Sequence, residues 1–214
     1  MTENEKYIFD YFMTGIKSGF QLLDDIIDET LEVVEDEGWE KEISEDWVEK
    51  NVECEYEKHK QESETWQHPT DTEKLILAFN TLRKEKIIAL HNAGYTQSEA
   101  IEDVSDMWQR LEDKGVQPVG YCYYHEQDLK RAINGGGLMI GFYGKKEKND
   151  KEAIIIGHKV VAALEAAGLE VIWNKTASKR IEIPNFEWRN ICIFGEETDN
   201  KWRHKNVLEM MAEQ

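Results

Sequence analysis

The sequence has few cysteines, no long apolar run and a shortage of basic residues, and each absence excludes a class of protein. Among its 214 residues are three cysteines, Cys54, Cys122 and Cys192, which are far apart and form no CxxC pair. An odd and scattered set supplies neither a disulfide framework nor a zinc site of paired thiolates. We therefore expect a reducing compartment.

Segments that would direct the chain to a membrane are not found either. The sequence opens with MTENEK, which has no basic stretch followed by an apolar one. No window approaches the roughly 18 apolar residues that a membrane-spanning helix requires. These observations predict a cytoplasmic protein.

Basic residues are outnumbered by acidic ones, 26 Lys and Arg against 44 Asp and Glu, for a net charge of -18. A surface that binds nucleic acid needs clustered Lys and Arg to neutralise phosphates, and an anionic membrane selects for the same residues. The composition thus predicts neither nucleic acid nor membrane as a partner. Hydrophobic residues make up 40% of the chain, which is enough for a packed core.

The negative charge is concentrated at the front of the chain. Residues 1–68 hold 21 acidic and 6 basic side chains, a net of -15, which leaves 23 acidic and 20 basic, a net of -3, for residues 69–214. We therefore predict an acidic helical region over 1–68 and an α/β domain over 69–189. Residues 190–214 would form a C-terminal extension, either an edge strand with a short helix or a partly mobile tail.

Helical periodicity dominates the acidic region. Apolar residues recur at steps of three and four, and they predict one buried stripe: Phe20, Leu23, Ile27, Leu31 and Val34. An earlier helix would end near Gly15 or Gly19, and a later one would begin at the N-cap Ser44.

From Pro69 onwards helices alternate with strands. Helix starts are marked by capping sequences at Thr70–Glu73 and Thr96–Glu99. The predicted strands are Ile87–Leu90, Val119–Tyr124, Leu138–Tyr143, Leu169–Trp173 and Arg180–Ile183, with Ile191–Phe194 as an edge strand and a closing helix over Val207–Met211. This order predicts an α/β or α+β sandwich around a mixed sheet of about five strands.

Several short strings together resemble an uncharacterised bacterial family catalogued only as a domain of unknown function. The strings are Trp66–Asp71, Tyr124–Asp128, Gly135–Leu138, Gly157–Gly168 and Phe186–Arg189. The acidic helical front resembles that family as well, so the similarity reaches to about residue 189. The resemblance implies an acidic helical part joined to an α/β part, and it implies no chemistry.

Polar residues follow the first two strands, and they are the candidate site. If these strands run parallel, their carboxyl ends meet at one edge, where open α/β sheets bind ligands. The candidate ligand-binding residues are His91, Asn92, Tyr95, Gln97, His125 and Gln127. For catalysis, His125 would act as acid or base and Asp128 would orient it. The alternative is that Asp128 only caps a helix beside a satisfied turn histidine.

The sequence predicts no metal and no cofactor. His91, His125, Asp128 and His158 are possible ligands, but their spacing matches no metal motif. Gly135–Gly137 precede a strand, whereas a phosphate-binding glycine run follows one and opens a helix.

The acidic region suggests a second kind of function. Asp24, Asp28, Glu32 and Glu35 form the candidate partner-binding face for a basic protein. The alternative is a solvated helix surface. Our leading hypothesis is a non-catalytic protein-binding module, an adaptor or a neutraliser of a basic protein. The other hypothesis is a small-molecule-binding protein or enzyme with a polar pocket around His125.

Overall fold

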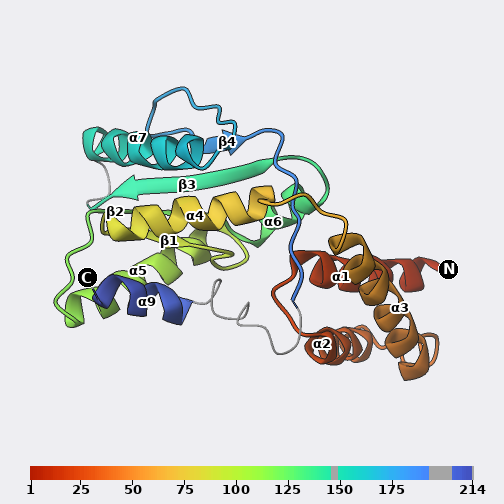
Figure 1. The fold of residues 1–214 in the computed structure, drawn as a ribbon. Coiled ribbons are helices and arrows are strands. Elements are labelled where there is room, and N and C mark those ends of the chain that lie inside the picture. Colours follow the sequence, from red (N-terminus) through yellow and green to blue (C-terminus); the bar gives the residue numbers. More distant parts are fainter. Residues whose placement is uncertain (146–148, 193–203, 214) are drawn as a thin grey trace. The chain divides into compact units, whose positions relative to one another are not determined.

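The computed structural model describes residues 1–145, 149–192 and 204–213. The chain forms two compact units, shown with their helices and strands in Figure 1. The first unit is Met1–His68 together with the segment that begins at Trp188, and the second is Pro69–Glu187 together with the C-terminal helix. None of the helices in the described ranges is both long enough and apolar enough to cross a membrane.

Three helices build the first unit: α1 (Glu3–Ser18), α2 (Leu23–Asp36) and α3 (Glu45–Ser63). The predicted N-cap of α3 is confirmed, because the Ser44 hydroxyl accepts from the Trp47 N–H at 3.3 Å. The buried residues of α2 are Ile26, Thr30 and Val34. Of the predicted stripe, Val34 is buried and Phe20 precedes the helix, while Leu23, Ile27 and Leu31 are partly buried against the same core. The shared core consists of Ile8, Phe12, Ile16, Ile26, Val34, Ile43, Val48 and Val52.

The segment after Trp188 closes the first unit. Asn190 Nδ2 donates to the carbonyl oxygens of Ser18, at 2.8 Å, and of Gly19, at 2.9 Å. Gly19 ends α1 with φ 66°, and a Cβ there would lie 2.6 Å from Asn190 Nδ2. Only glycine allows both this left-handed conformation and this close approach without strain.

The second unit combines helices with one four-stranded sheet. Its strands are β1 (Ile87–Leu90), β2 (Gly120–Tyr123), β3 (Leu138–Gly144) and β4 (Ile181–Ile183), and its helices are α4 (Asp71–Lys84), α5 (Gln97–Asp113), α6 (Glu126–Ile133), α7 (Asp150–Ala166) and α9 (His204–Ala212). The strand order is β1-β2-β3-β4. β1 and β2 run parallel, while β3 is antiparallel to both β2 and β4.

The mixed sheet is confirmed, but the prediction of about five strands is wrong. Leu169–Trp173 does not form a strand, because Ile172 alone pairs with Glu182 as an isolated bridge. After this bridge the chain turns away: the Trp173 indole Nε1 donates to the carbonyl oxygens of Thr176, at 3.2 Å, and Lys179, at 3.0 Å. A segment bent onto its own indole cannot continue a ladder.

Helices cover the two faces of the sheet unequally. α4 and α7 pack together on one face, against β1 and β3 respectively. On the other face α5 packs beside β1, where Ala100, Val104 and Leu111 share a core with Ile88 and Leu90. The part of this face that β2 and β3 form is therefore not covered by α5.

The C-terminal helix α9 contacts α4, α5 and β1. Its Val207, Leu208 and Met211 are buried in the same core as α5, as the predicted closing helix requires. It covers the edge strand β1, which protects the unpaired backbone groups of that edge. Of the predicted edge strand 191–194, residues 191 and 192 lie in no strand, and 193–194 lie outside the described residues.

Candidate functional site

The two predicted histidines follow neighbouring parallel strands, but their surroundings differ. His91 follows β1 and is 2% exposed. Its imidazole stacks on Phe79, with 4.5 Å between ring centroids and 26° between planes, and it meets Tyr124 edge-on at 5.6 Å. His91 is thus part of the aromatic packing between β1 and α4.

Four other predicted ligand-binding residues do not form one site: Asn92, Tyr95, Gln97 and Gln127. Tyr95 is 47% exposed, and the Lys130 ammonium lies 5.2 Å above its ring. Asn92 is half-buried with φ 46°, and Gln127 is exposed. Only Gln97, the first residue of α5, lines the pocket described below.

His125 and Asp128 form a buried pair at the start of α6. Both residues are 5% exposed. His125 is the N-cap, and its backbone N–H donates to Asp128 Oδ2 at 3.2 Å. The predicted alternative assigned the cap to Asp128; the structure gives that position to the histidine. His125 Nδ1 lies 3.1 Å from the same carboxylate oxygen.

Arg180 completes this cluster, although it lies 52 residues after Asp128 in the chain. The sequence analysis did not identify it. Its Nη2 donates to Asp128 Oδ2 and, at 3.0 Å, to the Met139 carbonyl oxygen. Its Nη1 lies 3.4 Å from His125 Nε2. Arg180 immediately precedes β4, so the pairing of β4 with β3 brings it next to α6.

The protonation of His125 follows from these partners. His125 Nδ1 lies 3.3 Å from the Asp128 backbone nitrogen and 3.1 Å from Asp128 Oδ2, so it would cap the helix as an acceptor or donate to the carboxylate. Because a guanidinium only donates and Arg180 Nη1 faces Nε2, we assign the imidazole proton to Nδ1, which then donates to Asp128 Oδ2. The Asp128 N–H is satisfied by the His125 carbonyl oxygen at 3.0 Å. Burial lowers the pKa of His125; the Asp128 carboxylate raises it and the Arg180 guanidinium lowers it. His125 is therefore held neutral.

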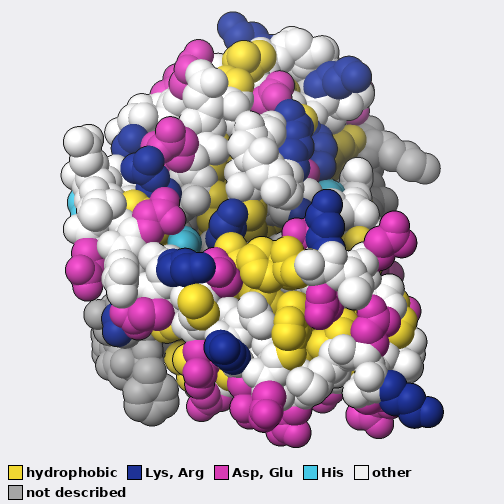
Figure 2. Space-filling view, turned by 90° about the vertical axis from the view of Figure 1, so that its right-hand side faces the viewer, with side chains coloured by type: hydrophobic (Ala, Val, Ile, Leu, Met, Phe, Trp, Pro, Cys, Tyr) yellow, Lys and Arg dark blue, Asp and Glu magenta, His cyan; other side chains and the backbone are white. Residues whose placement is uncertain are grey.

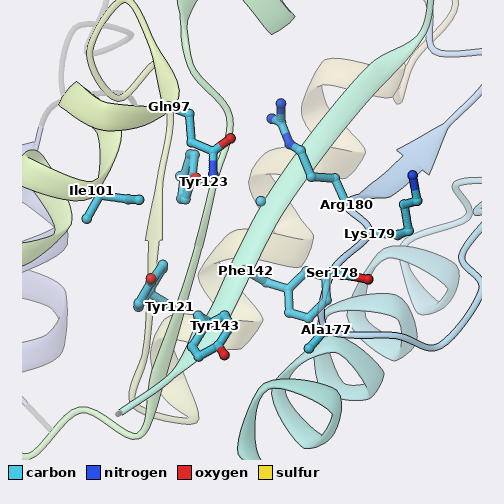
Figure 3. Close-up of a pocket in the computed structure, with 11 residues that line it drawn as sticks. Gln97, Ile101, Tyr121, Tyr123, Phe142, Tyr143, Ala177, Ser178, Lys179 and Arg180 are labelled. Carbon is cyan, nitrogen blue, oxygen red and sulfur yellow. The ribbon is translucent and has the colours of Figure 1, made fainter. Parts of the chain in front are cut away.

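A pocket of about 450 Å³ opens beside this cluster on the uncovered part of the sheet (Figure 3). Its floor is formed by β2 and β3, one wall by the start of α5, and the opposite wall by the loop that leads into β4. The lining residues are Gln97, Ile101, Tyr121, Tyr123, Gly141, Phe142, Tyr143, Ala177, Ser178, Lys179 and Arg180. In Figure 3 the Arg180 side chain extends across β3 towards Tyr123 and Gln97.

Tyr123 connects the pocket floor to the cluster. Burial raises the pKa of its phenol, Arg180 lowers it and Asp128 raises it, and the net direction is upwards. The hydroxyl of Tyr123 is therefore protonated at neutral pH and available as a donor. The sequence marked Tyr123 only as a strand residue.

Metal binding finds no support in the described part of the chain. There, no three His, Cys, Asp or Glu side chains are grouped so that they could hold an ion. His125 also lies next to the Arg180 guanidinium, whose positive charge would repel a metal ion.

A family model matches residues 1–192, and its description is a domain of unknown function, DUF6891. The chain belongs to this family. The match includes both the three N-terminal helices and the strands and helices around the pocket. No curated protein and no solved structure matched the chain significantly.

Proposed function

We propose that the second unit binds a small organic anion, a carboxylate or a phosphate, in the pocket between α5, β2, β3 and the 177–180 loop. The observation that carries this proposal is the state of Arg180. Its Nε is buried in the pocket wall and has no hydrogen-bond partner among the described residues. An unpaired buried donor costs about 1–3 kcal/mol. A ligand oxygen that enters the pocket and displaces the wall slightly at Nε would supply the acceptor.

The charge of the pocket supports the same class of ligand. The chain carries -18 overall, yet the pocket lining contains two basic residues, Lys179 and Arg180, and no acidic one. Gln97 adds an amide at the start of α5, where the helix dipole places partial positive charge. Asp128 and Met139 fix the guanidinium before any ligand arrives, which lowers the entropy lost on binding.

We propose binding and not catalysis, so the predicted catalytic pair, His125 and Asp128, has a different role. His125 and Asp128 do not line the pocket. The His125 lone pair that a general base would use is directed at Arg180. We therefore assign His125 and Asp128 as residues that position Arg180.

Binding of benzoate, measured by NMR titration of the backbone amides of β2 and β3, tests this proposal. We expect benzoate to bind and neutral benzamide to bind at least about tenfold more weakly, because a charge-assisted hydrogen bond contributes about 1.5–3 kcal/mol. Arg180→Gln should abolish binding. Lys179→Gln leaves the buried cluster intact and should weaken benzoate binding without loss of stability. Lys151→Gln removes a charge from the exposed surface of α7 and should leave benzoate binding unchanged. Equal binding of benzoate and benzamide would contradict the proposal.

A second function, docking of a basic protein on the first unit, is favoured by an observation on α2. Asp24, Asp28, Glu32 and Glu35 are exposed, and none forms an ion pair or hydrogen bond among the described residues. The last turn of α2 contains no basic residue, so its acidic end is unfavourable for the helix dipole. Figure 2 shows acidic side chains gathered along the lower edge of the molecule, at the height of α2 and α3.

A decalysine peptide tests this second function. Lysine substitutions at Asp24, Asp28 and Glu32 should weaken peptide binding more than lysine substitutions at Glu49, Glu53 and Glu57, which make the same charge change on α3. Binding to α2 should also weaken steeply with added salt, because exposed charges are screened. Equal losses from the two triple substitutions would mean that only net charge matters and would contradict a specific face on α2.

A further inference from the structure

The floor of the pocket is an aromatic surface with its polar groups at the edges. Tyr121 and Tyr123 are two residues apart on β2, so they share a face of the sheet. Their register partners on β3 are Tyr143 and Gly141, respectively. Three tyrosines and one glycine thus form a two-by-two patch beneath the pocket, as Figure 3 shows for the labelled tyrosines.

Gly141 allows the aromatic ring of Tyr123 to lie against the strand. A Cβ at Gly141 would be 2.6 Å from Tyr123 Cζ and 2.9 Å from its Oη, which is closer than real side chains approach. With no side chain at this position, the Tyr123 ring covers the backbone of β3. Its plane is 24° from that of Tyr121, with 6.2 Å between the ring centroids.

Phe142, between Gly141 and Tyr143 on β3, belongs to the opposite face of the sheet, where its ring lies against Gly157 of α7 and meets Trp173 edge-on with 5.3 Å between centroids. The aromatic surface of the floor is therefore formed by the three tyrosines. The volume of about 450 Å³ lies within the range of about 300–1,000 Å³ that is typical of small-molecule sites. Arg180 and Lys179 lie at one side of this aromatic floor, where an acidic group attached to a ring would reach them.

We infer that the anion bound in this pocket is an aromatic or heteroaromatic acid, whose flat ring lies on the Tyr121, Tyr123 and Tyr143 floor while its acidic group pairs with Arg180. This inference rests on the proposed anion binding and adds the class of ligand. Flat rings stack on or meet the edges of tyrosines with a gain beyond the burial of area, and a puckered ring does not. Polar groups at the margin, from Gln97 and Ser178, would contact ring substituents.

The experiment compares benzoate with cyclohexanecarboxylate, two acids of the same charge and similar size that are both ionised at pH 7.5. Affinities are measured by NMR titration of the full chain. We expect wild type to bind benzoate about threefold to tenfold more tightly. Tyr143→Leu should reduce this ratio towards one while cyclohexanecarboxylate binding is kept. Gly141→Ala should reduce it as well, because the new Cβ displaces the Tyr123 ring.

The outcomes separate this inference from the proposal beneath it. Equal affinities for the two acids in wild type would overturn the aromatic class and leave anion binding in place. Binding of neither acid would overturn both. A benzoate preference that survives Tyr143→Leu and Gly141→Ala unchanged would also overturn the inference, because the preference would then arise away from the tyrosine floor.

Discussion

At the scale of single residues, the cluster of His125, Asp128 and Arg180 consists of one ion pair and one neutral imidazole. Arg180 and Asp128 compensate each other, and the imidazole bridges them without carrying charge. Protonation of His125 would turn an N–H towards the guanidinium. The cluster is therefore expected to be sensitive to acid, and the sign of that sensitivity follows from the lowered pKa of His125.

The first prediction concerns the pH dependence of stability. The pKa of His125 is lowered in the folded state by burial, so below about pH 6.5, the ordinary histidine pKa, the unfolded chain takes up the proton more readily. The contribution of His125 to stability is complete above that pH and is lost as the pH falls towards the folded-state pKa. His125→Asn keeps a favourable N-cap and removes the titration. Its free energy of unfolding, from urea titrations at pH 7.5, 6.5 and 5.5, should fall less than that of wild type.

His158→Gln serves as the control for this prediction, because it removes an exposed imidazole from α7 of the same unit. It should show the wild-type loss of stability between pH 7.5 and 5.5. If His125→Asn loses as much stability as wild type over the same interval, the neutral state of His125 is not linked to folding.

Sequence reasoning found His125 and Asp128 but not Arg180, and the reason is sequence separation. His125 and Asp128 are three residues apart at a strand-to-helix turn, where local capping chemistry brings them together. Arg180 lies more than fifty residues later and reaches them only because β4 pairs with β3. Strand pairing cannot be read from strand order, so neither Arg180 nor the role of Tyr123 could be derived from the sequence.

At the scale of elements, the loop between Trp173 and Arg180 is fixed by its own first residue. The Trp173 ring packs between Phe142 and His158, with centroid distances of 5.3 and 5.2 Å. The face of α7 that receives it carries Gly157, where a Cβ would be 2.5 Å from Trp173 Cη2. The glycine on α7 thus determines where the loop that carries Lys179 and Arg180 can lie.

The second prediction compares two glycines within helices. Gly157→Ala should destabilise the second unit by about 1–3 kcal/mol, because the methyl group overpacks against Trp173 and Phe142. Gly15→Ala, in α1, places its Cβ no closer than 3.4 Å to any neighbour and should stabilise by up to about 1 kcal/mol through helix propensity. Thermal unfolding of both variants checks the opposite signs. Stabilisation by Gly157→Ala would show that the Trp173 loop moves without cost.

Elements with local signals were predicted and those fixed by distant contacts were not. The capping box at Thr70 is present, with the Glu73 N–H donating to the Thr70 hydroxyl at 3.2 Å and the Thr70 N–H to the Glu73 carboxylate at 2.7 Å. Thr96 also caps α5 through the Glu99 N–H. Residues 169–173 have strand composition, yet the Trp173 indole turns the chain after one bridge.

At the scale of the whole molecule, the chain leaves the first unit after His68 and returns to it at Trp188. The first unit therefore depends on residues that are more than 120 positions away from its helices. Trp188 Nε1 donates to the Ser18 carbonyl oxygen at 3.2 Å, and His59 Nε2 lies 2.9 Å from the Asn190 carbonyl oxygen. The predicted helical region 1–68 accounts for the helices of this unit but not for the segment that closes it.

The third prediction uses Asn190 to ask whether the two units unfold separately. Asn190→Ala removes the amide donor from the Gly19 carbonyl oxygen and leaves the Ser18 carbonyl oxygen with the Trp188 indole as its remaining side-chain donor. The loss of about 1–3 kcal/mol should lower hydrogen-exchange protection in α1 and α3 by roughly tenfold to a hundredfold and leave β2 and β3 unchanged. Asn185→Ala, which removes a surface hydrogen bond to Glu170 in the second unit, should not affect α1. Because each unit has its own buried core, a local loss is the physical expectation; equal loss of protection in α1 and β3 would instead require that the two cores unfold as one cooperative body.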